Sequence, residues 1–183
     1  HLNFNHTDTG YVFANVIKEE GQINQFSGET TLTGNADRFS GNIAVHQGKL
    51  TLAANIDQVN TQEPGSTSAS DNKFTVEGGT LIVNAEAGRM QTDFLGNTYY
   101  TNRNEVSGTG VLGGTGRLGN TTVQSGGTLS PGDNSIGTLK VQGNLDILDG
   151  GNYAVDVAGS GASDKVEVTG ATRLVGNTTV AVT

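Results

Sequence analysis

Apolar and polar residues alternate along this chain over short stretches, and no stretch shows the spacing of an amphipathic helix. The segment from Gly48 to Leu52 is Gly-Lys-Leu-Thr-Leu, which places Leu50 and Leu52 on one face of an extended backbone. The same alternation recurs in the pairs Phe74/Val76, Leu81/Val83, Leu139/Val141, Leu145/Ile147, Val155/Val157, Val166/Val168 and Val180/Val182. The pattern predicts many strands of about three to five residues, each directing such a pair inward.

Glycine marks the starts of many of these strands. The phrase Gly-X-Leu-X-aliphatic begins at Gly48, Gly79, Gly137 and Gly143, and a degenerate copy begins at Gly127. Glycine and asparagine tolerate the backbone angles of tight corners. Leu145 follows Leu139 by only six residues, which is too short for a helical crossover of about a dozen residues. Tight turns must therefore join these strands, either as hairpins or as corners of a coil.

A right-handed parallel β-helix accounts best for this pattern, and a β-sandwich is the alternative all-β fold. In the β-helix, coils of about 20–30 residues stack so that each coil buries its neighbour. We expect residues 1–106 to form such coils, with loop excursions near 56–72 and 85–105. Because the apolar pairs are denser towards the C-terminus, we expect residues 107–183 to form a C-terminal cap.

The second excursion carries the aromatic residues Phe94, Tyr99 and Tyr100. Two interpretations stay open for them. The rings either pin a long loop to the flank of the stack or form a ligand-contacting loop, since loops on a rigid scaffold commonly carry binding residues.

Composition limits the possible classes further. The chain has 183 residues, including 28 glycines and no cysteine, and only 33% of its residues are hydrophobic. Low apolar content is typical of disorder, but only 15% of the residues are charged and the apolar ones are patterned, which favours ordered strands. The absence of cysteine excludes disulfides and thiolate metal sites. The net charge of −8 disfavours nucleic acid as a partner.

Two parts of the chain resemble a known family. Ser27–Asn35, Phe39–Val45 and Gly48–Leu52 resemble the passenger-associated transport repeat of classical autotransporters of Gram-negative bacteria, with Asn42 in place of a glycine. The order of motifs from Ser107 to Ala171 is similar to the C-terminal part of autotransporter passengers. There the family has Pro-Gly-Asn-Ser-Pro-Gly, and this chain has Pro-Gly-Asp-Asn-Ser-Ile-Gly over 131–137, with one insertion and one replacement. The residues that carry this second likeness are Pro131, Gly132, Ser135, Gly137, Leu139, Val141, Asp164 and Lys165.

The resemblance implies a β-helical passenger of type V secretion that is exported through the outer membrane and displayed on the cell surface or secreted. It implies that this chain is a segment of a longer protein, whose own C-terminal β-barrel translocator lies outside it. It also implies a C-terminal autochaperone region that folds early and seeds the other coils. We therefore expect a non-enzymatic scaffold or adhesin, a virulence-associated function, with a host cell-surface or matrix ligand, or self-association, as its interaction.

No motif in the sequence favours a cofactor, a metal or a nucleophilic enzyme. The glycine-rich matches at Gly108 and Gly114 lack the following helix of a dinucleotide site, and serine-hydrolase motifs are absent. The three histidines, His1, His6 and His46, are not spaced as a site. A carbohydrate-active β-helix enzyme is the alternative function. It would require acidic residues such as Asp146, Asp149 and Asp156, or other Asp, Glu and Arg side chains, to converge on one face.

Overall fold

The fold was analysed in a computed structural model, which describes residues 1–57, 72–92, 96 and 98–183. These residues form 21 strands joined by turns, and none of them lies in a helix. The described residues therefore include no helix that could cross a membrane.

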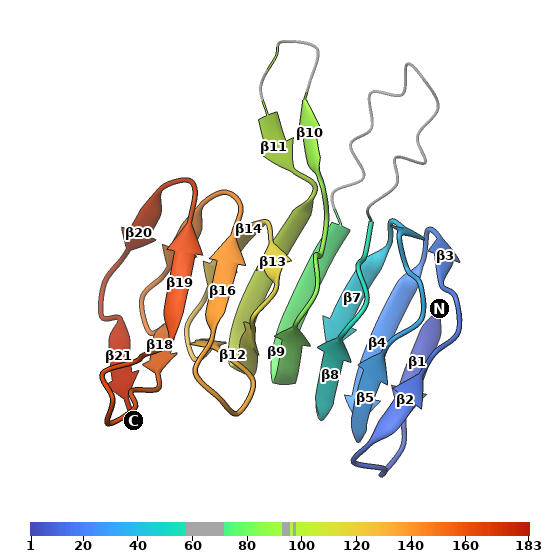
Figure 1. Ribbon diagram of the computed structural model, residues 1–183, viewed down its shortest axis with the longest axis horizontal. Coiled ribbons are helices and arrows are strands. Elements are labelled where there is room, and N and C mark those ends of the chain that lie inside the picture. The colour runs from blue at the N-terminus through green and yellow to red at the C-terminus, as the bar shows by residue number, and fades with distance from the viewer. Residues whose placement is uncertain (58–71, 93–95, 97) are drawn as a thin grey trace.

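The strands form three rows, each of which runs the length of the molecule (Figure 1). The first row contains β1 (Leu2–Asn5), β4 (Gln22–Ser27), β7 (Asn42–Val45), the first halves of β9 (Asn72–Val83) and β12 (Asn102–Gly114), β14 (Asn120–Val123), β17 (Leu145–Ile147) and β20 (Thr172–Leu174).

The second row contains β2 (Tyr11–Phe13), β5 (Glu29–Leu32), β8 (Lys49–Leu52), the second halves of β9 and β12, β15 (Thr128–Pro131), β18 (Asn152–Val155) and β21 (Thr179–Val182). The third row is formed by β3 (Lys18–Glu19), β6 (Arg38–Phe39), β13 (Arg117–Leu118), β16 (Thr138–Val141) and β19 (Lys165–Val168). Single bridges from Ala36 to Ile56 and from Ile56 to Ala87 connect its two parts.

Pairing within the rows is parallel throughout the described strands. Each strand pairs with one that follows it by 17 residues, as Val111 with Thr128, to 31 residues, as Leu50 with Leu81. A β-sandwich is built from antiparallel neighbours, so the parallel rows rule out that alternative. Within the described residues, only the small sheet of β10 (Met90–Thr92) and β11 (Thr98–Tyr100) pairs two strands in antiparallel fashion.

The glycine phrase marks a column in the second row. Leu50, Leu81, Leu112 and Leu129 are aligned across β8, β9, β12 and β15, and all four are fully buried. Two residues before each leucine stands a glycine at the corner between the first and second rows. At Gly79, φ is 124° and a Cβ would lie 2.6 Å from the carbonyl oxygen of Gly48, so this corner admits no side chain.

The other copies of the phrase open strands elsewhere. Leu139 belongs to β16 in the third row, and Leu145 belongs to β17 in the first row. The six residues between them turn a corner from one row to the next and do not form a hairpin. The sequence repeat therefore marks corners in general, not one side of the molecule.

Side-chain carbonyl and carboxylate oxygens hold the corners of successive passes of the chain together. Each accepts a hydrogen bond from a backbone N–H of the following pass, at donor–acceptor distances of 2.7–3.1 Å: Asn42 from Lys73, Asn55 from Glu86, Asn84 from Thr115, Asn120 from Asn144, Asn144 from Ala171 and Asp149 from Asn177. Many of the asparagines in the sequence thus satisfy backbone donors where the regular ladder is interrupted.

Two strands are longer than expected. β9 has 12 residues and β12 has 13, because each continues from the first row through the corner into the second. A register shift between Val106 and Thr109 accommodates the corner in β12. The expected boundary at residue 106 therefore lies inside one strand, and a single hydrophobic core cluster extends across it.

The excursion expected over 85–105 is shorter in the structure. Glu86 and Ala87 continue the third row through bridges, and Asn102–Glu105 already belong to β12. Only the hairpin of β10 and β11 leaves the rows, and it projects from one edge of the molecule (Figure 1). In the first expected excursion, Ile56 and Asn72 belong to the rows, and residues 58–71 lie outside the described residues.

Most of the expected inward pairs are buried, but three of the valines are not. Val157 lies beyond the end of β18, and Val180 and Val182 in β21 are more than half exposed. β21 pairs only with β18 among the described strands, so no further strand covers the side chains of these two residues. The expectation of dense inward packing up to Val182 is wrong for this last strand.

The core column gives a direct test of this burial. Replacing Leu112, which is 0% exposed, with alanine should lower the free energy of unfolding by about 2–5 kcal/mol, because the other strands cannot close the cavity. The matched control is Leu174→Ala in β20, where the leucine is 62% exposed and the loss should be below about 0.5 kcal/mol. Urea denaturation measures both, and equal losses would contradict the assignment of the core.

Candidate functional site

The C-terminal motif residues meet at a corner between β15, β16 and β19. Asp164 is only 4% exposed and uses both carboxylate oxygens. Oδ1 accepts from the backbone N–H of Gly137 at 2.8 Å, and Oδ2 accepts from that of Asp156 at 3.1 Å. The backbone N–H of Lys165 donates to the carbonyl of Gly137 at 3.0 Å. Asp164 therefore joins the third row to the end of β18.

The remaining motif residues lie around this carboxylate. Pro131 ends β15 and is aligned with Gly114 of β12, and Gly132 exchanges two backbone hydrogen bonds with Gly114 at 2.7 and 2.9 Å. Gly132 has a φ of 87°, which suits glycine at this tight bend. Ser135 is exposed on the loop that follows. Leu139 and Val141 are fully buried in β16. The structure thus brings the motif together as one packed corner.

The loop of this motif also reaches a strand far away in the sequence. Asp133 Oδ1 lies 2.8 Å from the Nζ atom of Lys49 in β8, and the amide of Asn84 donates to its Oδ2 at 3.4 Å. Asp133 lies in the segment where this chain departs from the family pattern by an insertion. The sequence gave no signal for Lys49 as its partner, because 84 residues separate the two.

The candidate contact loop is only partly placed. Phe94 lies outside the described residues, and Tyr99 is described only as a backbone position of β11, opposite Gln91. Tyr100 is 6% exposed and its hydroxyl has no hydrogen-bond partner. Burial raises the pKa of Tyr100 above its ordinary value, so the ring is neutral. Tyr100 packs inward at the base of the hairpin and offers no surface for a ligand, which favours the pinning interpretation for this residue.

A buried polar cluster closes the base of the same hairpin. Asp57 is fully buried and accepts from the Thr101 hydroxyl at 2.8 Å, and it pairs with the Arg89 guanidinium. The backbone N–H of Arg89 donates to Thr101 Oγ1 at 3.1 Å. Burial raises the pKa of the Asp57 carboxyl, although Thr101 and Arg89 both favour its charged form.

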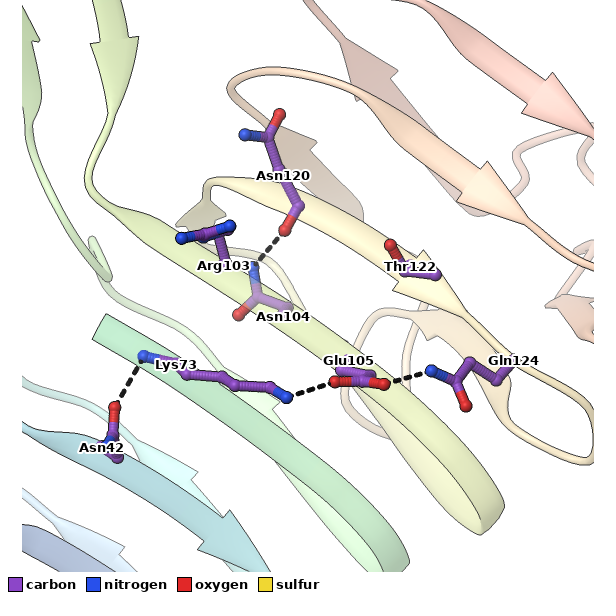
Figure 2. Close-up of a pocket in the computed structure, with 8 residues that line it drawn as sticks. All are labelled: Asn42, Lys73, Arg103, Asn104, Glu105, Asn120, Thr122 and Gln124. Atoms are coloured by element: carbon purple, nitrogen blue, oxygen red, sulfur yellow. Dashed lines mark hydrogen bonds and ion pairs between the residues drawn. The ribbon is translucent and has the colours of Figure 1, made fainter. Parts of the chain in front are cut away.

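A polar groove lies over the outer face of the first row (Figure 2). It has a volume of about 600 Å³ and crosses β7, β9, β12 and β14. Glu105 lies at its centre, where the Lys73 Nζ atom approaches Oε2 to 2.5 Å and the Gln124 amide donates to the same carboxylate. The other residues that line the groove are Asn42, Arg103, Asn104, Asn120 and Thr122.

This groove does not contain the parts of a hydrolytic site. Glycoside hydrolysis ordinarily needs two carboxyl groups on opposite sides of the scissile bond. Glu105 is the one carboxylate among the described residues that line the groove, and it is already ion-paired. Asp146 pairs with Arg173 on the next strands, at 2.9 Å, and Asp149 and Asp156 lie at other corners. No group of three or more His, Asp or Glu among the described residues could hold a metal ion.

Neither the protein-family models nor the curated proteins compared with this chain give a match.

The two hydrogen bonds of Asp164 lead to a test. In Asp164→Asn, the amide keeps one acceptor oxygen and turns an N–H₂ group towards a backbone donor, so one buried N–H loses its partner. We expect a loss of about 1–3 kcal/mol in the free energy of unfolding. The control is Asp149→Asn, because Asp149 accepts from a single exposed N–H through one oxygen and the amide can still do so. A smaller loss at Asp164 than at Asp149 would contradict the geometry.

The buried carboxyl of Asp57 predicts a dependence on pH. A carboxyl group whose pKa is higher in the folded state binds its proton there first. It therefore stabilises the fold below its ordinary pKa of about 3.9, and that contribution is lost as the pH rises through the folded value. The free energy of unfolding of the wild type, relative to Asp57→Asn, should therefore increase as the pH falls from 7 towards 4. A decrease would mean that the ion pair with Arg89 dominates over burial.

Proposed function

We propose that this chain is a segment of a right-handed parallel β-helix from an exported autotransporter passenger, with a non-enzymatic function as a surface scaffold or adhesin. The observation that carries the proposal is the continuous parallel pairing of the three rows from β1–β3 to β19–β21 around one core. Such a stack presents a long, rigid surface. Its place would be the outer surface of a Gram-negative cell or the medium around it.

The C-terminal part has features that suit an autochaperone. Around β12, β14 and β15 the aligned residues are only 17 apart in the sequence, as Val111 and Thr128 are, whereas Leu50 and Leu81 are 31 apart. Shorter closures cost less conformational entropy and form faster. The corner at Asp164 then fixes β16 against β19. These features support early folding of residues 107–183, followed by addition of the N-terminal passes.

Enzymatic function is the weaker candidate. The alternative of a carbohydrate-active enzyme needs convergent catalytic acids, and the polar groove offers one ion-paired carboxylate among its described lining residues. The exposed interaction surfaces of the stack are therefore better suited to binding than to catalysis.

The order of folding tests the proposal in the intact chain. During refolding from urea, pulsed hydrogen exchange should protect the amides of β14, β16 and β19 before those of β5, β7 and β8. The Asp164→Asn variant should delay protection of β16 and β19, and Asp149→Asn should leave the order and the rates unchanged. If the N-terminal amides gain protection first, or all amides together, the autochaperone function is wrong.

A further inference from the structure

We propose that the polar groove of the first row binds an extended, neutral oligosaccharide through its hydroxyl groups. This inference rests on the proposed function as a surface adhesin and names the chemical class of its ligand. It is carried by residues that the resemblance does not single out, and it concerns a different face from the Pro131–Gly137 corner.

The groove is a regular array of polar side chains. Asn42, Lys73, Arg103 and Asn120 occupy successive outward positions across β7, β9, β12 and β14. Two residues further along the strands, Glu105 and Thr122 form a second outward column. Neighbouring strands lie about 4.8 Å apart, so the polar groups recur at that interval over the width of the groove. A linear ligand that crosses the strands would meet a new set of polar groups at each one.

The chemistry of these groups suits sugar hydroxyls. A hydroxyl both donates and accepts, and the groove offers amides, a hydroxyl, two cationic groups and a carboxylate within one surface. Glu105 is held in place by Lys73 and Gln124, so its remaining acceptor positions are fixed before a ligand arrives (Figure 2). A pre-arranged set of this kind loses little conformational entropy on binding.

Charge distinguishes a neutral ligand from a polyanion. Within the groove, two cations and one carboxylate leave a small local excess of positive charge. The chain as a whole has a net charge of −8, so long-range repulsion acts against an acidic polymer. The described lining residues include no aromatic ring on which a sugar face could stack, so binding relies on many hydrogen bonds. Affinity for one oligosaccharide is then modest and increases when many copies are displayed together.

The test uses the intact chain and three neutral hexasaccharides, derived from cellulose, chitin and starch. At least one should give saturable shifts in an NMR titration, centred on the amides of residues 73, 103–105 and 120–124. Thr122→Tyr should weaken this binding at least tenfold, because the larger side chain fills the groove. Thr51→Tyr is the matched control: Thr51 is equally half-buried on the outer face of β8 in the second row, and strands tolerate tyrosine. It should leave the affinity unchanged.

Three results would overturn the inference. The first is the absence of saturable binding by all three neutral hexasaccharides. The second is that only a heparin-derived hexasaccharide binds, with an affinity that falls steeply as salt is added. The third is that Thr51→Tyr weakens binding as much as Thr122→Tyr does. None of these measurements depends on the order of folding, so the oligosaccharide inference and the autochaperone function can fail separately.

Discussion

Parallel alignment of each strand with the strand one pass later is the constraint on which the rest of this structure depends. Most of the strands have two to four residues, too few to persist alone. Their backbone groups are satisfied only if neighbouring passes stay in register and approach closely at the corners. The bare corner at Gly79, below the carbonyl of Gly48, permits that approach, and side chains such as Asn120 and Asn144 supply the acceptors that the interrupted ladder lacks.

Much of the fold could be predicted because its signals are local. Alternation at Leu50/Leu52 and Leu139/Val141 fixes which side chains face inward, and the glycine before each pair marks a corner. The lengths of β9 and β12 could not be predicted, because a strand that continues through a corner has the same local sequence as two short strands. The exposure of Val182 was missed for a related reason: alternation indicates the inner face, but burial also needs a neighbouring strand to cover it.

The candidate sites show where sequence reasoning loses its grip. Asp164 was singled out by its motif, yet its role depends on two N–H groups that come from different rows. The partnership of Lys49 with Asp133 is invisible in the sequence because it joins distant passes. The polar groove is assembled from outward residues such as Lys73 and Thr122, each of which is an ordinary solvent-facing residue in its own strand. Only the register between strands turns such residues into a surface.

The hairpin of β10 and β11 shows how the chain can accommodate new material. It leaves the third row after Ala87 and rejoins the first row at Asn102, and the strands on both sides keep their register. Asp57, Arg89 and Thr101 close its base, so the core below is sealed from whatever the hairpin carries. A corner closed in this way separates the history of the surface from that of the core. Loops can be gained, lost or exchanged there while the buried column of leucines stays the same.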